Sequence, residues 1–444
     1  MSVIRTVTSR EIPDSFYSIR RLEDAVEVVR GILSSVRDRG DEAVRECASR
    51  FDRANPASFE VDPAMLADAE QKMKKDKPAL YDALCLSRDL ALSFAKRQRE
   101  SFDDFESELS PGLITGQRTI AVDRAGLYVP GGRFPLFSSV IMCASPARAA
   151  GVGELVFCTP PVAQSDPALA DIPCVDEAIM ATASLCGITR VFAIGGAQAI
   201  GAMAYGTHSV PKVNVIVGPG NKYVAAAKKM VYGEVGIDLL AGPSEVFIIA
   251  DGSADFRWVA RDMLAQAEHD PDAQAVLVTN DSLLAERVEK ELETLLEPLG
   301  SDSPAALSFS ANGWIILCES LDEAASIANR KAPEHLELAL EAGAVRDALE
   351  TTLRNYGSLF IGHKSAEVLG DYAAGLNHTL PTSSSALFTG GLSVRHFLKT
   401  VTTLRTAERP GSDVRGLNAS LAAAALLADA EGLCGHALAA RVRL

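Results

Sequence analysis

Histidine is scarce in this chain, so the surroundings of each histidine can be compared. The seven histidines are His208, His269, His335, His363, His378, His396 and His436. In AQAEHD, Gln266 precedes His269 by one helical turn, and the residues before it have a helical composition. Both side chains should then project from one helix face. That arrangement suits two metal ligands or a polar pair at a site, and it equally suits a solvated helix end.

An acidic residue adjoins a histidine in KAPEHLEL, where Glu334 directly precedes His335. The proline before them should end the preceding helix, which places the pair at the start of the next element. Adjacent carboxylate and imidazole groups can divide the general-base steps of a reaction between them. The alternative is a surface turn in which Glu334 is the N-terminal carboxylate of a helix.

Two further histidines have a carboxylate nearby. GDYAAGLNHTLPT combines Asp371 with His378 in an irregular segment, and such loops on α/β scaffolds tend to hold functional residues. EGLCGH places Glu431 shortly before His436 at the end of the chain. A helix C-terminus with a histidine that favours the helix dipole would have the same pattern.

Four of these residues have the donor types of a metal site. His269, Asp371 and His436, with the amide oxygen of Gln266, would provide nitrogen and oxygen donors without a thiolate. Zn²⁺ or a similar borderline metal accepts such a set. Spacing along the chain does not bring the four together, so at this point the metal site is one hypothesis among several.

Signals for a dinucleotide cofactor are partial. GPGNKY follows an apolar run and contains G-x-G, but Tyr223 stands where the usual fingerprint has its third glycine. IGGAQAIG also follows an apolar run and also departs from the pattern. Tyr128 begins the glycine- and proline-rich loop YVPGGRFPLFSS. Its ring could stack on a planar cofactor, or it could fill a domain boundary.

The elements that must position these residues alternate between short strands and helices. Apolar runs predict strands at 154–158, 190–194, 213–217, 245–251, 275–280, 314–318 and 358–362. Glycines and alanine-rich helical stretches between them are typical of parallel sheets covered by helices on both faces. Helical patterns also span 22–40 and 63–101, and an alanine-rich helical tail ends the chain. The fold class is therefore α/β, with enough strands for two incomplete Rossmann-like sheets.

The composition excludes several classes of function. The chain has 58 acidic residues, 43 basic residues and a formal net charge of −15. This balance argues against nucleic-acid or anionic-membrane partners. No apolar run approaches the roughly 18 residues needed to cross a bilayer, and the N-terminus lacks the apolar core of a secretory signal. The eight cysteines form no C-x-x-C pair, which indicates reduced thiols and a cytoplasmic location.

Eight segments, in order along the chain, resemble the histidinol dehydrogenase family. They are AGLYVPGGRFPLFSSVIM, GGAQAIGAMAYGT, VGPGNKYVAAAK, GIDLLAGPSEV, LAQAEHDP, KAPEHLEL, GDYAAGLNHTLPT and EGLCGH. The resemblance runs from about residue 22 to 440. An ordered set of eight is far more specific than any one of its motifs.

Four parts of the chain are expected. They are an N-terminal extension at 1–22, a first, discontinuous Rossmann-like domain at 23–127 and 244–385, a second at 128–243, and a helical C-terminal tail at 386–444. Proline and glycine residues at 129–132 and 241–244 mark the predicted crossings, where the chain passes from one domain to the other. The first domain should hold the catalytic and metal residues, and the second the coenzyme contacts. Residues 161–173 should form a surface loop.

The resemblance implies a zinc-dependent dehydrogenase that oxidises L-histidinol through L-histidinal to L-histidine with two NAD⁺ in succession. Carried over residue by residue, it implies zinc ligands at Gln266, His269, Asp371 and His436, and a catalytic pair at Glu334 and His335. Substrate contacts would come from the zinc ligands and His335 together with Ser244, His378 and Glu431. NAD contacts would come from Tyr128, Gln198 and Asn221.

The resemblance also implies a homodimer with shared active sites. The C-terminal tail would cross to the other subunit, where His436 would complete the zinc shell. Residues 389–402, TGGLSVRHFLKTVT, further resemble relatives that oxidise a sulfonated propanediol. Another amino alcohol or a sulfonated diol is therefore the alternative substrate.

Overall fold

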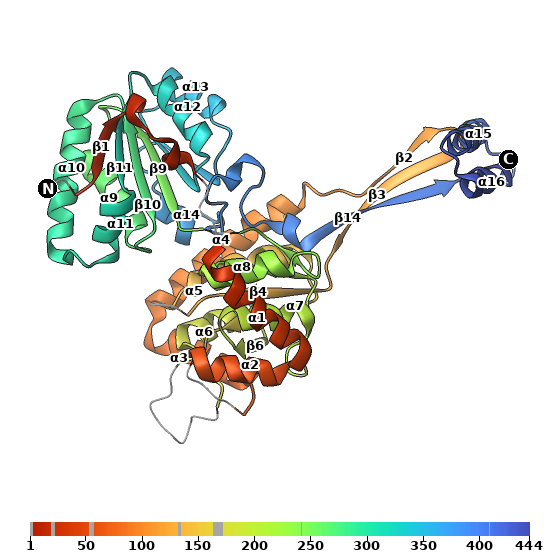
Figure 1. The fold of residues 1–444 in the computed structure, drawn as a ribbon, viewed down its shortest axis with the longest axis horizontal. Coiled ribbons are helices and arrows are strands. Elements are labelled where there is room, and N and C mark those ends of the chain that lie inside the picture. The colour runs from red at the N-terminus through yellow and green to blue at the C-terminus, as the bar shows by residue number, and fades with distance from the viewer. Residues whose placement is uncertain are drawn as a thin grey trace. The chain divides into compact units, whose positions relative to one another are not determined.

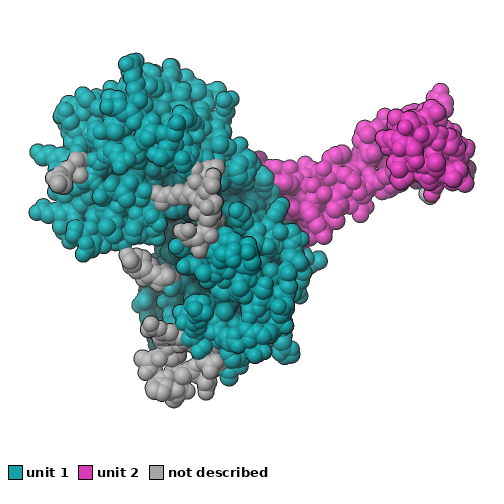
Figure 2. Space-filling view, in the orientation of Figure 1, with its two compact units in different colours: residues 1–96, 123–397 teal, residues 97–122, 398–444 magenta. Residues whose placement is uncertain are grey.

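The computed structural model of the chain describes residues 3–18, 23–52, 57–131, 135–162, 172–240, 242–407 and 409–444. The chain forms two compact units (Figure 2), the first made of Met1–Lys96 and Asp123–Phe397, the second of Arg97–Val122 and Leu398–Leu444. The predicted crossings at 129–132 and 241–244 and the predicted loop at 161–173 lie partly outside the described residues.

The larger sheet of the first unit has six parallel strands in the order β1-β11-β10-β9-β12-β13 (Figure 1). Its strands are β1 (Arg5–Thr8), β9 (Glu245–Ala250), β10 (Gln274–Thr279), β11 (Trp314–Leu317), β12 (His335–Ala339) and β13 (Ser358–Ile361). Its helices are α9 (Phe256–Ala267), α10 (Ser282–Leu296), α11 (Pro304–Asn312), α12 (Leu321–Lys331), α13 (Ala344–Thr352) and α14 (Glu367–Tyr372).

Side chains of β9 alternate between the two faces of this sheet. Val246 and Ile248 join a core formed with α9, α10 and α11, whereas Phe247 and Ile249 join a core formed with α12 and α13. Because both faces are buried, the strand is a continuous apolar run, as is typical of a parallel sheet between helix layers.

The second parallel sheet has five strands in the order β6-β5-β4-β7-β8. Its strands are β4 (Arg124–Tyr128), β5 (Glu154–Thr159), β6 (Arg190–Ala193), β7 (Val215–Val217) and β8 (Gly236–Ile237). One core joins this sheet to α1 (Glu23–Arg39), α2 (Asp41–Cys47), α7 (Gly196–Tyr205) and α8 (Lys222–Val231). In addition, α5 (Phe137–Ala150) packs on β4, α6 (Glu177–Leu185) on α5, and α3 (Pro63–Asp76) on α6. The helix α4 (Pro78–Arg99) follows α3.

The predicted α/β class with two Rossmann-like parallel sheets is confirmed. All seven predicted strands form, with ends within about two residues of those expected from apolar runs. No helix among the described residues is both long and apolar enough to cross a membrane. The eight cysteines are all free thiols.

The N-terminal part of the chain groups differently from the prediction. The described part of the predicted N-terminal extension is not separate, because Arg5–Thr8 pairs with β11 and becomes an edge strand of the six-stranded sheet. Residues 23–127 do not join that sheet either. The apolar stripe of α1, including Val29 and Leu33, is buried against α7 and α8 of the five-stranded sheet. Helical periodicity shows which face of α1 is buried but not which sheet covers it.

The second unit contains an antiparallel sheet in the order β14-β3-β2. Its elements are β2 (Phe105–Ser110), β3 (Leu113–Ala121), β14 (Leu398–Thr406), α15 (Arg415–Ala430) and α16 (Cys434–Arg441). The prediction of a wholly helical tail at 386–444 is therefore wrong. In LKTVTTLRT, a run of β-branched residues favours a strand, and β3 pairs with this strand along its full length.

Candidate active site

The predicted catalytic pair lies at the amino end of a strand. Glu334 immediately precedes β12, and His335 is its first residue, paired with Val246 of β9 and Ser358 of β13. Both side chains are buried. The alternative of a surface turn ahead of a helix is therefore wrong, because LEL continues as a strand between two neighbours.

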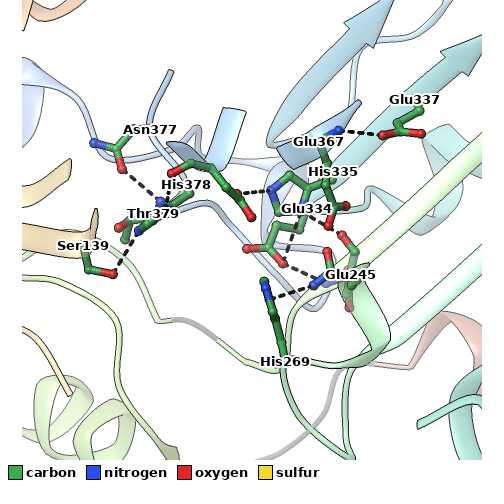
Figure 3. Close-up of polar contacts among 12 residues, drawn as sticks. Ser139, Glu245, His269, Glu334, His335, Glu337, Glu367, Asn377, His378 and Thr379 are labelled. Atoms are coloured by element: carbon green, nitrogen blue, oxygen red, sulfur yellow. Dashed lines mark hydrogen bonds and ion pairs between the residues drawn. The ribbon is translucent and has the colours of Figure 1, made fainter. Parts of the chain in front are cut away.

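The main chain of Glu245, the first residue of β9, contacts both members of the pair (Figure 3). Its N–H donates to Oε2 of Glu334 at 2.8 Å, and its carbonyl oxygen lies 3.1 Å from Nδ1 of His335. A carbonyl oxygen can only accept, so Nδ1 carries a hydrogen. Nε2 is then the ring nitrogen that can take up a further proton.

Carboxylates surround the ring of His335. Oε2 of Glu334 lies 3.8 Å and Oε2 of Glu367 lies 4.0 Å from Nδ1, while Oδ1 of Asp371 lies 3.7 Å from Nε2. Burial alone would lower the pKa of His335, but the charge of Glu334 and the contact with Asp371 outweigh it and raise the pKa to about 10. Burial raises the pKa of Glu334 to about 8, against the opposing attraction of His335. The raised pKa values favour the protonated forms of Glu334 and His335, which are adjacent residues.

His378 follows α14 and is held at both ring nitrogens. Nδ1 lies 3.1 Å from the carbonyl oxygen of Asp371, and Nε2 lies 3.0 Å from Oγ of Ser139 in α5. Burial lowers the pKa of His378 and favours the neutral ring. Nδ1 therefore donates to the carbonyl, and the Ser139 hydroxyl donates to Nε2. This contact connects the catalytic region to a helix of the other sheet.

Gln266 is fully buried in α9, whereas His269 is exposed. The amide nitrogen of Gln266 lies 3.3 Å from Nδ1 of His269. The prediction that one helix carries both residues is wrong, because α9 ends at Ala267. Pro271 follows closely, and a proline disfavours helix at the residue before it.

The residues present fit a zinc ion. Oε1 of Gln266 is buried without a hydrogen-bond partner, as expected of an oxygen reserved for a ligand. Burial would raise the pKa of Asp371, but His335, His378 and His269 together lower it, so His269 lies within electrostatic range. Among the described residues, no three His, Cys, Asp or Glu side chains are grouped closely enough to hold a metal. The fit to zinc therefore rests on the donor types and on the unpartnered oxygen of Gln266.

Three other predicted substrate or metal residues are Ser244, Glu431 and His436. Ser244 is half-buried directly before β9, and its carbonyl oxygen accepts from the N–H of Gln274 at 2.9 Å. Glu431 is the C-terminal cap of α15, and His436 lies in α16; both are exposed in the second unit. Their roles stay predictions.

The predicted NAD contacts lie at the carboxyl ends of β4, β6 and β7. The hydroxyl of Tyr128 accepts from the N–H of Gly196 at 3.0 Å, and the amide of Gln198 donates to Asp52 at 3.2 Å. The Oδ1 of Asn221 accepts from N–H groups in the first turn of α8. Tyr128 and Gln198 are buried, while Asn221 is exposed.

This edge of the five-stranded sheet fits a dinucleotide. Glycine turns lead into the N-termini of α7 and α8, where backbone N–H groups and the helix dipole favour phosphate. Ligands of open α/β sheets bind at the carboxyl ends of the strands. The contacts of Tyr128 and Gln198 with protein groups indicate that these two residues also shape the turn at Gly196.

The chain is similar to proteins of one family over nearly its whole length. Residues 18–444 match the family model described as histidinol dehydrogenase. Histidinol dehydrogenase from Gluconobacter oxydans is 44% identical over 420 residues, which cover 94% of this chain and 92% of that protein. The chain belongs to the histidinol dehydrogenase family. Histidinol dehydrogenase from Dechloromonas aromatica is 42% identical over 425 residues, covering 95% of this chain and 93% of that protein.

A solved histidinol dehydrogenase shares the fold over the whole chain. The crystal structure of the enzyme from Elizabethkingia anophelis matches with a TM-score of 0.88 at 31% sequence identity, covering 100% of this chain and 98% of that one. The family resemblance read from the eight sequence segments is thereby confirmed.

The sequence patterns missed several residues that hold the site together. Glu245 and Lys331 form a buried ion pair behind the catalytic pair, and Ser139 bonds to His378. Glu367 lies beside His335. A charged residue at the start of the apolar run EVFIIAD was the one available signal for Glu245. Lys331, at the end of a helix before a proline, has the sequence context of a surface lysine.

Proposed function

We propose that this chain is a zinc- and NAD-dependent histidinol dehydrogenase, which oxidises L-histidinol to L-histidinal and then to L-histidine. The observation that carries the proposal is the fixed tautomer of His335 beside Glu334. With Nδ1 bonded to the carbonyl of Glu245, the ring presents Nε2 as the proton acceptor.

In the first oxidation, Nε2 of His335 accepts the hydroxyl proton of the alcohol as hydride leaves the carbinol carbon. NAD⁺, when bound, supplies the hydride acceptor for each of the two oxidations. The buried position of His335 keeps bulk water from its reacting nitrogen.

The second oxidation requires water, because an aldehyde has no hydroxyl proton to give up. Glu334 takes a proton from the water that adds to the aldehyde carbon. His335 gives the proton that it accepted in the first oxidation to the carbonyl oxygen, which yields the hydrated aldehyde with two hydroxyl groups. His335 then accepts a hydroxyl proton of the hydrate as the second hydride leaves, which yields the carboxylic acid. Two adjacent groups of different basicity suit these consecutive proton transfers.

Gln266, His269 and Asp371 would hold zinc, together with His436 of the partner subunit. When bound, the metal supplies a Lewis-acid anchor for the amino and imidazole nitrogens of the substrate. Zinc held by Asp371 would offset the charge of one of the carboxylates that, with Glu334, raise the pKa of His335, and would so favour the neutral ring that a base requires.

A homodimer with shared sites accounts for the second unit. Leu426 and Leu427 on α15, Leu438 on α16 and Val442 directly after α16 are exposed. Amphipathic helices of this kind gain stability by docking their apolar residues on another surface. In the proposed dimer these helices dock on the other subunit, with Glu431 and His378 contacting substrate.

A steady-state assay tests the proposed function. Purified protein should form NADH from L-histidinol and NAD⁺, with two NADH per histidine produced. Chelation should abolish the reaction, and added Zn²⁺ should restore it. Activity on a sulfonated propanediol or another amino alcohol, with none on L-histidinol, would contradict the proposed substrate and favour the alternative.

A further inference from the structure

Lys331 and Glu245 form a buried ion pair, and the main chain of Glu245 contacts the catalytic pair. Lys331 is the last residue of α12, and its Nζ lies 3.5 Å from Oε1 of Glu245. Only 4% of Lys331 and 7% of Glu245 are exposed to solvent. The Lys331 ammonium also donates to the carbonyl of Phe16 at 3.4 Å. Two charges have therefore been removed from water next to the reaction centre.

Two serines in left-handed backbone conformation bond to the same pair. Ser383 has φ of 53° and Ser384 has φ of 63°. The N–H of Ser383 donates to Oε1 of Glu245 at 3.2 Å, and the hydroxyl of Ser384 donates to the carbonyl of Lys331 at 2.9 Å. Left-handed conformations are unfavourable for non-glycine residues and tend to persist where the surroundings enforce them, often at functional sites.

The side chain of Glu245 is thus fixed at the point where its main chain contacts the catalytic residues. Its N–H and carbonyl bond to Glu334 and His335, and the ion pair with Lys331 restrains the side chain of the same residue. Figure 3 shows Glu245 beside both side chains.

We propose that Lys331 and Glu245 are positioning residues, which act through the main chain of Glu245 to hold Glu334 and His335 in their reactive orientation. This inference rests on the proposed function. It assigns to the ion pair a role in turnover and not in substrate affinity, because neither side chain reaches the reacting atoms.

Stability alone is a poor explanation for this pair. Replacing a buried ion pair by apolar residues of similar volume is often neutral or stabilising, because the desolvation cost is large. The second carboxylate oxygen, Oε2 of Glu245, is buried without a hydrogen-bond partner. An ion pair between Lys331 and Glu245 that is present despite this desolvation cost is consistent with a role in positioning the catalytic residues.

The primary test is Lys331→Met, which removes the charge and keeps the length of the side chain. We expect kcat for L-histidinol oxidation to fall by about ten- to a hundredfold, because small misplacements of catalytic groups have effects of this size. KM for L-histidinol and for NAD⁺ should change less than about threefold, since the binding residues are untouched.

Two matched variants separate positioning from general destabilisation. Ile327→Ala, one turn earlier in α12, removes a buried side chain of the apolar core and should leave kcat near the parent value. Lys331→Arg keeps the charge and should recover most of the lost kcat. A cavity of about 240 Å³, lined by Lys331, Glu245 and Trp314, offers room for the larger guanidinium.

If Lys331→Met does not fold, Lys331→Met/Glu245→Gln removes both charges, and the same kcat loss at near-constant KM is expected of it. If the variant that folds has a kcat within twofold of the kcat of Ile327→Ala, the proposal is wrong.

A crystal structure of the folded variant gives a readout independent of activity. The separation between the Glu245 carbonyl and Nδ1 of His335 should exceed hydrogen-bond range, about 3.5 Å. An unchanged separation would also overturn the proposal. A parent protein without histidinol dehydrogenase activity would count against the proposed function. In that case the separation between the Glu245 carbonyl and Nδ1 of His335 would still test whether the ion pair positions the catalytic residues.

Discussion

The α-carbon of Gly218 lies so close to Tyr128 that a β-carbon on it would be 2.0 Å from the Tyr128 carbonyl oxygen. The two residues follow the paired ends of β4 and β7, at the edge predicted to bind NAD. The N–H of Gly218 donates to Asp238 at 2.8 Å, and buried Lys228 donates to the Gly218 carbonyl at 2.9 Å. Lys228 and Asp238 are themselves ion-paired. The glycine is therefore held in place from both sides.

Gly218→Ala should destabilise the protein by more than about 3 kcal/mol, because steric overlap adds to backbone strain at φ of 116°. Gly233→Ala is the control, since φ is 104° there and no atom lies within 4 Å of the added carbon. That variant should lose only about 1–2 kcal/mol. Denaturant unfolding measures both, and equal losses would show that the contact with Tyr128 does not matter.

Glu334→Gln and His335→Asn should separate the two half-reactions. Without the Glu334 carboxylate, oxidation of L-histidinal should slow by about a hundredfold or more, since that step needs an activated water. His335→Asn should slow both oxidations, because each releases a hydroxyl proton. Pre-steady-state NADH formation from L-histidinol and from L-histidinal measures the steps. Parent rates for L-histidinal in Glu334→Gln would show that the carboxylate is not the base.

Stability should depend on pH through Glu337, which lies two residues after His335 in β12. Burial, helped by the charge of Asp262, raises the pKa of Glu337 to about 8 from 4.5. The folded state therefore holds this proton more tightly than the unfolded state. The resulting stability is present below the unfolded pKa and is lost as pH rises towards 8.

Glu337→Gln keeps the acceptor for the N–H of Glu367, which lies 2.8 Å from Oε1 of Glu337, and cannot ionise. Its stability relative to the parent should improve between about pH 5 and pH 9 in urea unfolding. Exposed Glu293→Gln on α10 is the control. A difference between Glu337→Gln and the parent that stays constant with pH would contradict the expected proton linkage.

Shared active sites predict complementation between inactive chains. A Glu334→Gln/His335→Asn chain and a His436→Ala chain, mixed under subunit exchange, should regenerate activity. Each mixed dimer then has one site with Glu334, His335 and a donated His436 all intact. Exchange is followed by mass spectrometry of tagged chains. Exchange without recovered activity would indicate that His436 acts within its own subunit.

Local patterns were sufficient for some parts of this protein. The strand at 245–250 is an apolar run because helices bury both faces of its sheet, and that pattern does not depend on neighbours in space. Glu334 and His335 were recognisable as a pair because they adjoin along the chain. The grouping of α1 with the five-stranded sheet was not predictable, because an apolar helix stripe is compatible with either sheet.

The sequence by itself determined the α/β class, the positions of seven strands along the chain, the family, and the chemical types in the candidate site, since all of these depend on local residue patterns. Only the tertiary structure decided that Glu245 lies between Lys331 and the catalytic pair, and that Ser139 bonds to His378 across 239 residues. These contacts arise when parallel strands and helices distant in sequence pack together. Their energies belong to pairs of residues, so no local pattern encodes them.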